Sequence, residues 1–274
     1  MTGGRRLADS ESRNTAATTH PLRIVVWNAN MALHRKLDAL QALAPDIAVI
    51  PECAKPEVLS KRTGAGGVPE MVWVGANPNK GLGVFAFHPY SISLSSTYDR
   101  RLEWIAPVSV QGPTPFFLLA AWCMNHRCRA HSPEFPTRQV EPAIQGHAAT
   151  IASVPTVLAG DLNNNVTWDR PNKPHSFASL VDLARQLGLE SAYHEIKGVA
   201  FGSEPDATLY WRDRTEHGLR YHIDFCFLPR AWLPFVTSVS VGDFASWVAP
   251  GLSDHVPLVT DLQIPASWPR PDPA

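Results

Sequence analysis

The chain has 274 residues, of which 45% are hydrophobic, and 24 Lys and Arg residues nearly balance 25 Asp and Glu residues to leave a net charge of -1. This composition can bury a large core in one or two domains and excludes a chain that is disordered throughout. The near-neutral charge provides no overall positive field of the kind that attracts nucleic acid, although a local basic patch is still compatible with it.

Both ends of the chain are expected to lie outside the folded domain. Residues 1–20 lack the apolar core of a secretory signal and are predicted to form a disordered leader, and the proline-rich residues 265–274 are predicted to form a tail. The folded domain is therefore expected at residues 21–264. No apolar run reaches the roughly 18 residues that a membrane span needs. We expect a cytoplasmic protein with reduced cysteines and no membrane partner, and the sequence does not indicate its oligomeric state.

Eight short runs rich in Val, Ile and Leu are predicted to be strands. They cover residues 22–27, 46–50, 81–87, 104–110, 116–124, 156–160, 223–228 and 257–262. Their apolar residues are often contiguous, which is typical of strands that are covered on both faces.

Apolar residues at helical spacing separate some of these strands. Leu33, Leu37, Leu40 and Ala44 form one stripe, a second helix is expected over residues 140–152, and a third is expected to stop at Gly188. Between residues 85 and 124 the pattern is strand, turn, strand instead, which predicts antiparallel pairing. The sequence therefore predicts a layered α/β fold with mixed sheets.

Polar side chains gather at the ends of five predicted strands. They are Asn28, Glu52, Asp161 with Asn163, Asp224, and Ser253, Asp254 and His255. Because open α/β sheets commonly place their sites at strand ends, these side chains could converge in one cleft. Four acids provide oxygen ligands only, which suits Mg²⁺, or Mn²⁺ as a substitute, better than zinc.

Each of these motifs also has an ordinary structural explanation. Asn28 alone is typical of a turn, Glu52 alone of a solvated strand end, and Asp161 with Asn163 of an Asx turn. Turns do not explain why five separate strands end in such residues, so we favour a common site.

The ordered motifs WNAN (27–30), PE (51–52), GDLN (160–163), HIDF (222–225) and SDH (253–255) resemble those of the endonuclease/exonuclease/phosphatase superfamily. This superfamily includes deoxyribonuclease I and the exonuclease III-like abasic-site nucleases. The resemblance spans about residues 22–262 and implies a four-layer α/β/β/α sandwich of two packed mixed sheets flanked by helices. It also implies a Mg²⁺-dependent phosphoester hydrolase, most simply a phosphodiesterase or nuclease, in which a metal-activated water attacks the phosphate.

By motif position, the resemblance also implies metal ligands in this chain. Glu52 is similar to the main Mg²⁺ ligand, with Asn28 beside it, and Asp254 is expected to support the metal or the water. Charge neutralisation by such a metal contributes several kcal/mol of transition-state stabilisation.

The same resemblance implies the catalytic side chains. Asp161 is expected to orient and deprotonate the attacking water, and Asn163 to hold the scissile phosphate. Asp224 is expected to orient His255, which would stabilise the transition state.

One position departs from the family pattern. Where the family usually has a histidine or tyrosine after the strand before the central helix, this chain offers Trp122, or Asn125 and His126 slightly beyond it. The sequence does not choose between Trp122 and His126. A zinc site built on Cys123, His126, Cys128 and His131 is an alternative, but Cys123 ends an apolar strand and the spacing does not fit paired zinc knuckles.

Two loops carry aromatic and basic side chains beside these motifs. Trp168 and Arg170 follow the GDLN motif, and Tyr210 and Arg212 precede the HIDF motif. Together with His126 they are predicted to bind a phosphate-ester substrate that contains a nucleotide or nucleic acid, the alternative being ordinary surface loops. The near-neutral net charge does not favour binding to the many phosphates of a long duplex. Two alternatives stay open: a phosphomonoesterase that acts on small molecules, and a non-catalytic protein that binds a phospholigand.

Overall fold

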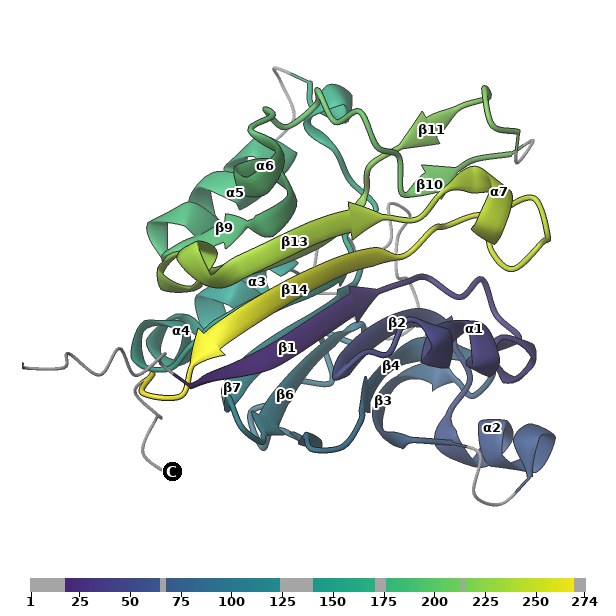
Figure 1. Ribbon diagram of the computed structural model, residues 1–274, viewed down its shortest axis with the longest axis horizontal. Coiled ribbons are helices and arrows are strands. Elements are labelled where there is room, and N and C mark those ends of the chain that lie inside the picture. The colour runs from purple at the N-terminus through teal and green to yellow at the C-terminus, as the bar shows by residue number, and fades with distance from the viewer. Residues whose placement is uncertain (1–17, 65–67, 124–139, 171–175, 213–214, 269–274) are drawn as a thin grey trace, which may run out of the picture.

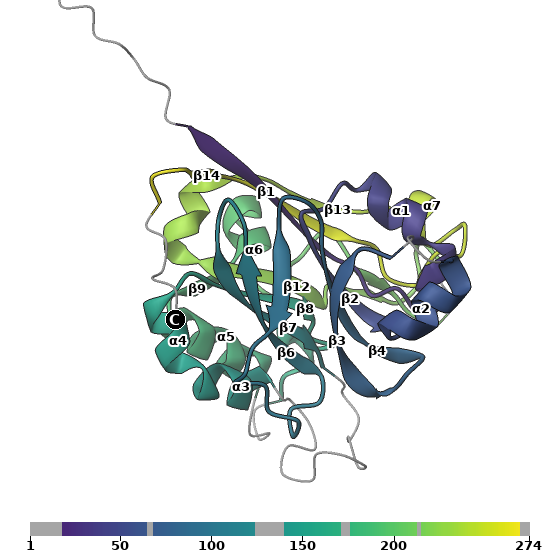
Figure 2. The same cartoon turned by 90° about the horizontal axis from the view of Figure 1, so that it is seen from below.

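The structure is a computed structural model that describes residues 18–64, 68–123, 140–170, 176–212 and 215–268. In this part of the chain, two six-stranded mixed sheets pack face to face, and helices cover their outer faces (Figure 1). Figure 2 shows α1 and α2 on one side of the sheets and α3, α4 and α5 on the other. The predicted four-layer α/β/β/α sandwich is confirmed.

The first sheet has the strand order β13-β14-β1-β2-β4-β3. Its strands are β1 (Thr19–Val26), β2 (Ile47–Cys53), β3 (Glu70–Asn77), β4 (Lys80–Ala86), β13 (Val236–Val241) and β14 (Leu258–Pro265). Within it β1 and β2 are parallel, whereas β1 and β14 are antiparallel.

The second sheet has the strand order β5-β6-β7-β8-β12-β9. Its strands are β5 (Ser91–Leu94), β6 (Ile105–Gln111), β7 (Phe116–Trp122), β8 (Thr156–Asp161), β9 (Leu189–Ser191) and β12 (Asp224–Pro229). Here β7 and β8 are parallel and β12 runs antiparallel to β8. A separate hairpin of β10 (Leu209–Tyr210) and β11 (Arg220–Tyr221) leads into β12.

The helices are short. The α-helices are α1 (Leu37–Ala42), α2 (Pro56–Thr63), α3 (Val140–Gly146), α4 (Ala148–Ser153), α5 (Phe177–Gln186), α6 (Ala192–Lys197) and α7 (Phe244–Trp247), and the 3₁₀ helices are η1 (Leu33–Arg35), η2 (Val166–Trp168) and η3 (Arg230–Phe235). In the described part of the chain, no helix is long and apolar enough to span a membrane.

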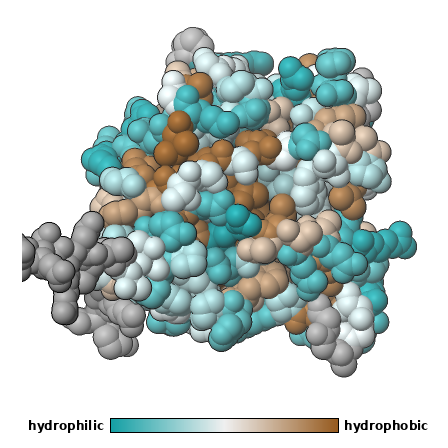
Figure 3. All heavy atoms as spheres, viewed as in Figure 1, coloured by the Kyte–Doolittle hydropathy of each residue, from teal (hydrophilic) through white to brown (hydrophobic). Residues whose placement is uncertain are grey.

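Alternation along the strands divides the core into layers. In β8, Val157 and Ala159 face the other sheet, whereas Leu158 packs against the helices outside. In β2, Val49 faces the other sheet and Ile50 packs beneath α1 and α2. On the face seen in Figure 3, apolar residues gather around α6 and β13, with hydrophilic residues around them.

All eight predicted strands are present in the two six-stranded sheets, and the four strands of these sheets that were not predicted are their edge strands, while the short hairpin strands β10 and β11 were also not predicted. β3, β5, β9 and β13 end the two sheets. Three of these edge strands are only partly buried, with patterns such as VTSVSV in β13. Such strands lack the contiguous apolar run that marks a central strand.

Two predicted helices are each divided in two. The helix expected from Leu33 to Ala44 breaks at Lys36, whose ammonium turns back to the carbonyl groups of Ala29 and Met31. The helix expected over residues 140–152 breaks at His147, whose ring bonds the carbonyl oxygen of Ala143 at 2.9 Å. Polar side chains that satisfy nearby backbone groups compete with the helix.

The folded domain extends slightly beyond residues 21–264 at both ends. β1 begins at Thr19, which pairs with Pro265 of β14. Trp268, expected in the tail, packs edge-on against Phe235 with ring centres 5.6 Å apart.

Strand direction brings the polar motifs to one end of the sandwich. The parallel strands β1 and β2 end next to Asn28 and at Glu52, and β8 ends at Asp161. β12 runs antiparallel and begins at Asp224, the cross-strand partner of Asp161. His255 comes shortly before β14, which is antiparallel to β1. The side chains therefore meet where the two sheets lie together.

Candidate active site

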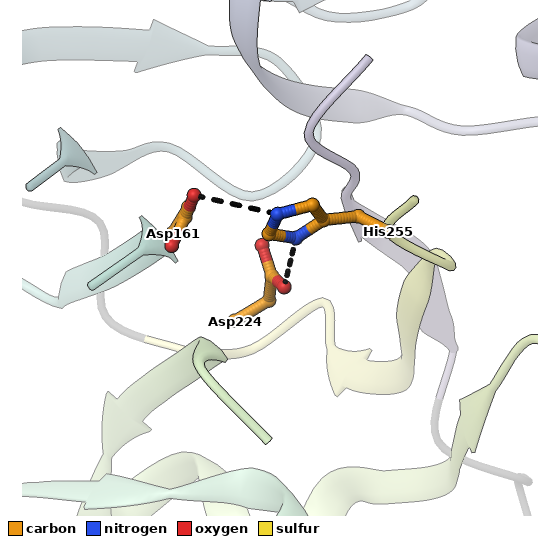
Figure 4. Close-up of side chains that lie close together, drawn as sticks. All are labelled: Asp161, Asp224 and His255. Carbon is orange, nitrogen blue, oxygen red and sulfur yellow. Dashed lines mark hydrogen bonds and ion pairs between the residues drawn. The ribbon is translucent and has the colours of Figure 1, made fainter. Parts of the chain in front are cut away.

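A buried imidazole lies between two buried carboxylates (Figure 4). His255 Nδ1 lies 2.8 Å from Asp224 Oδ2, and His255 Nε2 lies 4.0 Å from Asp161 Oδ2. Asp161 and Asp224 are fully buried and His255 is 6% exposed. The hydrogen bond to Asp224 fixes Nδ1 as the donor and directs Nε2 toward Asp161.

Asp161, Asn163 and Asn28 form one hydrogen-bonded group. Asn163 donates its backbone N–H to Asp161 Oδ1 at 2.9 Å and its Nδ2 to Oδ2 at 3.1 Å. Asn28 Nδ2 donates to the same Oδ2 at 3.0 Å. The Asx turn and the common site were alternatives in the sequence, and the structure contains both.

Glu52 reaches the group through a bulge in β2. The register shifts between Pro51 and Cys53, and Glu52 has φ of +58°, a conformation that costs free energy in a residue other than glycine. Its Oε1 lies 3.5 Å from Asn28 Nδ2. Regular alternation would point Glu52 to the outer face with Ile50, so the bulge is what brings this acid to the site.

Gly160 allows β7 and β8 to approach closely before Asp161. It has φ of +147°, and a Cβ atom at this position would lie 1.8 Å from the carbonyl oxygen of Ala121. The glycine of the GDLN motif is therefore a requirement of the fold at the base of the site.

Burial and a neighbouring acid raise the pKa of Asp161. Burial is the larger cause and the charge of Asp224 adds to it, while His255, Asn28 and Asn163 oppose them, and the pKa rises to about 8. Its carboxylate thus has the proton affinity that suits a general base near neutral pH.

The surroundings of His255 favour its charged form. Burial alone would lower its pKa, but the charge and hydrogen bond of Asp224, with Asp161 and Asp254, outweigh burial and raise the pKa to about 10. His255 is therefore an imidazolium at neutral pH, able to stabilise or protonate an anionic oxygen.

The acids of the site fit a divalent cation. Ligand atoms of Asp161, Asp224 and His255 lie within 4.8 Å of one another, and Asp224 Oδ1 is buried with no hydrogen-bond partner among the described residues. Because His255 binds Asp224 and is protonated, it is a poor ligand, and the carboxylates are the better donors for a hard cation.

Glu52 is the sequence-predicted ligand best placed to bind such a cation. Its side chain is 19% exposed at the edge of the buried group. The amide oxygen of Asn28 accepts the backbone N–H of Asn30 at 2.9 Å and keeps a second lone pair. The Nδ2 of Asn28 donates to the acids and so helps to orient them.

The segment around His255 is held by groups that the sequence motifs only partly indicated. Ser253 Oγ donates to the carbonyl oxygen of Asn28 at 2.7 Å, and Trp27 Nε1 donates to that of His255 at 3.1 Å. Thr208 Oγ1 accepts the backbone N–H of Asp224 at 3.1 Å. Asp254 is partly exposed beside Ser253, and its carbonyl oxygen accepts the N–H of Tyr210.

Two lysines near the site were missed in the sequence. Buried Lys36 secures the loop after Asn28, where three successive residues adopt positive φ. Lys80 Nζ lies 3.2 Å from Glu52 Oε2 and 5.4 Å from the centre of the Trp122 ring. The position of Lys80 on the same face of β4 as Leu82 and Val84 was a usable signal.

The predicted substrate-binding side chains separate into exposed and buried ones. Trp168 is partly exposed with its ring 4.7 Å from that of Tyr221, and Arg170 is exposed. Arg212 lies 4.6 Å from the ring of Trp211, which is 44% exposed.

Tyr210 differs from its prediction. It is 8% exposed and packs against Phe244 with ring centres 5.2 Å apart. Both residues of the two-residue strand β10 are buried, and Trp211, which follows the strand, reaches the surface instead of Tyr210.

The remaining predicted positions divide between the core and the undescribed part of the chain. Trp122 is 2% exposed and packs edge-on against Trp104, so its ring belongs to the core. His126, with Asn125, Cys128 and His131, lies outside the described residues. Cys123, the remaining member of the alternative zinc set, is buried, and burial raises the pKa of its thiol.

No family model matches this sequence, and no curated protein matches it. Several solved structures do match. An AP endonuclease from Archaeoglobus fulgidus has a TM-score of 0.60 and 18% identity, covering 87% of this chain and 98% of that chain. A 3′-5′ exonuclease from Neisseria meningitidis has a TM-score of 0.57 and 19% identity, covering 88% of this chain and 99% of that chain.

A protein from Beutenbergia cavernae described as endonuclease/exonuclease/phosphatase has a TM-score of 0.57 and 21% identity, covering 89% of this chain and 72% of that chain. At these identities the likeness shows a shared fold. This chain therefore has the endonuclease/exonuclease/phosphatase fold, and the predicted resemblance to that superfamily is confirmed at the level of the fold.

Proposed function

We propose that this protein is a metal-dependent phosphoester hydrolase, and specifically a phosphodiesterase that cleaves a nucleotide-containing substrate. The observation that carries the proposal is the convergence of Glu52, Asp161 and the Asp224–His255 pair on one point between the sheets. Side chains at the ends of five strands form this group, which includes the buried acids Asp161 and Asp224, and such groups are typical of catalytic sites.

In this proposal each residue has a role that its contacts support. Glu52 would hold Mg²⁺ or Mn²⁺, with Asp254 beside the site, and the cation would supply charge neutralisation and a water of lowered pKa. Asp161, whose pKa is about 8, would accept the proton of the attacking water.

His255 would act on an oxygen of the reacting phosphate. Its Nε2 is directed by Asp224 and would donate to an oxygen that gains negative charge in the transition state. Asn163 would hold the scissile phosphate. Its Nδ2 now donates to Asp161 and to the carbonyl oxygen of Cys123, so it would exchange one of these bonds for the substrate.

Partly exposed aromatic rings favour a substrate with a base. Trp168 and Tyr221 are in contact, Tyr221 lies near Trp211, and Arg212 lies over Trp211. Tyr221 lies three residues before Asp224, so this surface adjoins the catalytic group. Aromatic side chains stack on bases without regard to sequence.

A phosphomonoesterase is the second candidate. The Neisseria protein, which shares this fold, is described both as a 3′-5′ exonuclease and as a 3′ phosphatase bound to a product DNA hairpin. A site of this fold can therefore act on either ester, and the substrate of this chain has to be measured.

The test is an assay with Mg²⁺, and with EDTA, on single-stranded and duplex DNA, RNA, a 3′-phosphorylated oligonucleotide and bis-p-nitrophenyl phosphate. We expect hydrolysis that needs the metal and falls about 10³-fold or more in Asp161→Asn and about 10²-fold or more in His255→Gln. Asp182→Asn, an exposed acid of α5, is the matched control and should keep full activity.

Two results would contradict the proposal. Activity that survives Asp161→Asn would place the chemistry elsewhere. Uptake of an oligonucleotide in calorimetry with no turnover at saturating Mg²⁺ would identify a non-catalytic binding protein.

A further inference from the structure

Lys80 places a positive charge at the edge of the catalytic group. Leu82 and Val84 of β4 face the second sheet, and Lys80 continues this row at the start of the strand. Its ammonium lies 3.2 Å from Glu52 Oε2 and its side chain is 32% exposed. The ammonium is therefore both within reach of solvent and part of the site.

The ring of Trp122 contacts the ammonium of Lys80. Trp122 is the last residue of β7 and lies beside Asp161 in the parallel register of β8. Its buried ring lies 5.4 Å from the Lys80 ammonium, within the range of a cation–π contact. Its Nε1 is buried with no partner among the described residues. The face of the Trp122 ring therefore supports the Lys80 ammonium at the edge of the site.

The two amide donors of the group are already engaged. Asn28 Nδ2 donates to Glu52 and Asp161, and Asn163 Nδ2 donates to Asp161 and the carbonyl oxygen of Cys123. The ammonium of Lys80 has three donors on a flexible four-carbon stem. It can turn from Glu52 toward an anion while its stem stays against Trp122.

We propose that Lys80 is a further catalytic residue of this site, whose ammonium donates to a non-bridging oxygen of the substrate phosphate. This inference rests on the proposed function. The simpler role for Lys80 is to neutralise Glu52 when no other cation is bound. The two roles predict different effects of removing the charge.

The test uses Lys80→Met, which keeps the length of the side chain, and Lys80→Arg, which keeps its charge. Binding of inorganic phosphate in the presence of Mg²⁺ is measured by calorimetry, and kcat and KM are measured on bis-p-nitrophenyl phosphate. We expect Lys80→Met to weaken phosphate binding about 10-fold or more and to lower kcat/KM about 10- to 100-fold. Lys80→Arg should recover most of both.

Lys55→Met is the matched control, because Lys55 forms a comparable ion pair with Glu57 at 3.5 Å on the surface. It should change neither phosphate binding nor kcat/KM. Circular dichroism checks folding, and Lys80→Gln replaces Lys80→Met if the latter does not fold.

The outcomes separate this inference from the proposed function. If Lys80→Met binds phosphate and hydrolyses the ester as the natural protein does, and only binds Mg²⁺ more tightly, Lys80 merely neutralises Glu52 and the inference is overturned. If the natural protein hydrolyses nothing, the proposed function fails. The phosphate titration then still decides whether Lys80 binds the anion.

Discussion

Asp161 and Asp224 lie directly opposite each other on β8 and β12, with both side chains fully buried. Like charges at paired positions of a sheet destabilise it. His255 compensates part of this repulsion, since it lies 2.8 Å from Asp224 and 4.0 Å from Asp161. The fold thus maintains an electrostatically unfavourable pair of buried acids.

Replacing Asp161 should stabilise the metal-free protein. A carboxyl group whose pKa rises from 3.8 to about 8 on folding binds its proton more tightly in the folded state. Stability is therefore lost as pH increases from about 4 to about 8. In EDTA at pH 8, Asp161→Asn should raise the free energy of unfolding by about 1–2 kcal/mol, or Tm by about 2–8 °C. Scanning calorimetry measures the shift, with Asp182→Asn as control, and a lower Tm in Asp161→Asn would refute the prediction.

Removing the partner of His255 should have the opposite effect on stability. The folded-state pKa of His255 is about 10, above its usual 6.5, so the stabilisation is fully present below pH 6.5 and is lost as pH rises through about 10. Asp224→Asn should lower the pKa of His255 below 6.5, because burial then dominates, and should cost about 3–5 kcal/mol at neutral pH. NMR titration of the imidazole gives the pKa. A value still near 10 would show that Asp224 is not its main partner.

At the scale of elements, the close approach of β7 and β8 depends on Gly160. Gly160→Ala should destabilise the protein by about 3 kcal/mol or more, since the added Cβ would overlap the carbonyl oxygen of Ala121 at a positive φ. Gly146→Ala is the matched control, because a Cβ there meets nothing within 4 Å. Urea unfolding measures both variants. Equal stability of the two would mean that β7 and β8 can separate at no cost.

The sequence predicted the elements that carry contiguous apolar residues and failed where burial is partial. The central strands β1, β2, β8 and β12 were identified together with the polar residues at their ends. The edge strand β13 was missed because only one of its side chains is buried, so it lacks a contiguous apolar run. The helices broken at Lys36 and His147 depend on side-chain bonds to carbonyl groups, which apolar spacing does not reveal.

The candidate site was predicted more completely than its surroundings. Asp161, Asp224 and His255 lie together as their motifs indicated. Lys80 was missed because it belongs to no motif and comes to Glu52 only through the pairing of β4 with β2. Tyr210 was assigned to substrate because the residues of its loop were counted by type, whereas its burial depends on packing against Phe244, which is distant in sequence.

At the scale of the whole molecule, the net charge of -1 bears on the substrate. A protein that contacts only one or two phosphates should show a slope of about -1 to -2 for log kcat/KM against log salt concentration. We therefore expect the rate on an oligonucleotide to fall only about 4- to 16-fold between 50 and 200 mM salt. Steady-state kinetics at several salt concentrations measures the slope. A slope of about -5 or steeper would instead indicate that the protein contacts many phosphates of a long duplex.

The central claim is that acids from both sheets form one metal-dependent site between them. Anomalous diffraction from crystals grown with Mn²⁺ and inorganic phosphate locates the cation directly. We predict a peak in contact with the carboxylate of Glu52, with the phosphate beside His255 and Asn163. A crystal with no peak at Glu52, or with the cation bound at another part of the chain, would contradict the account.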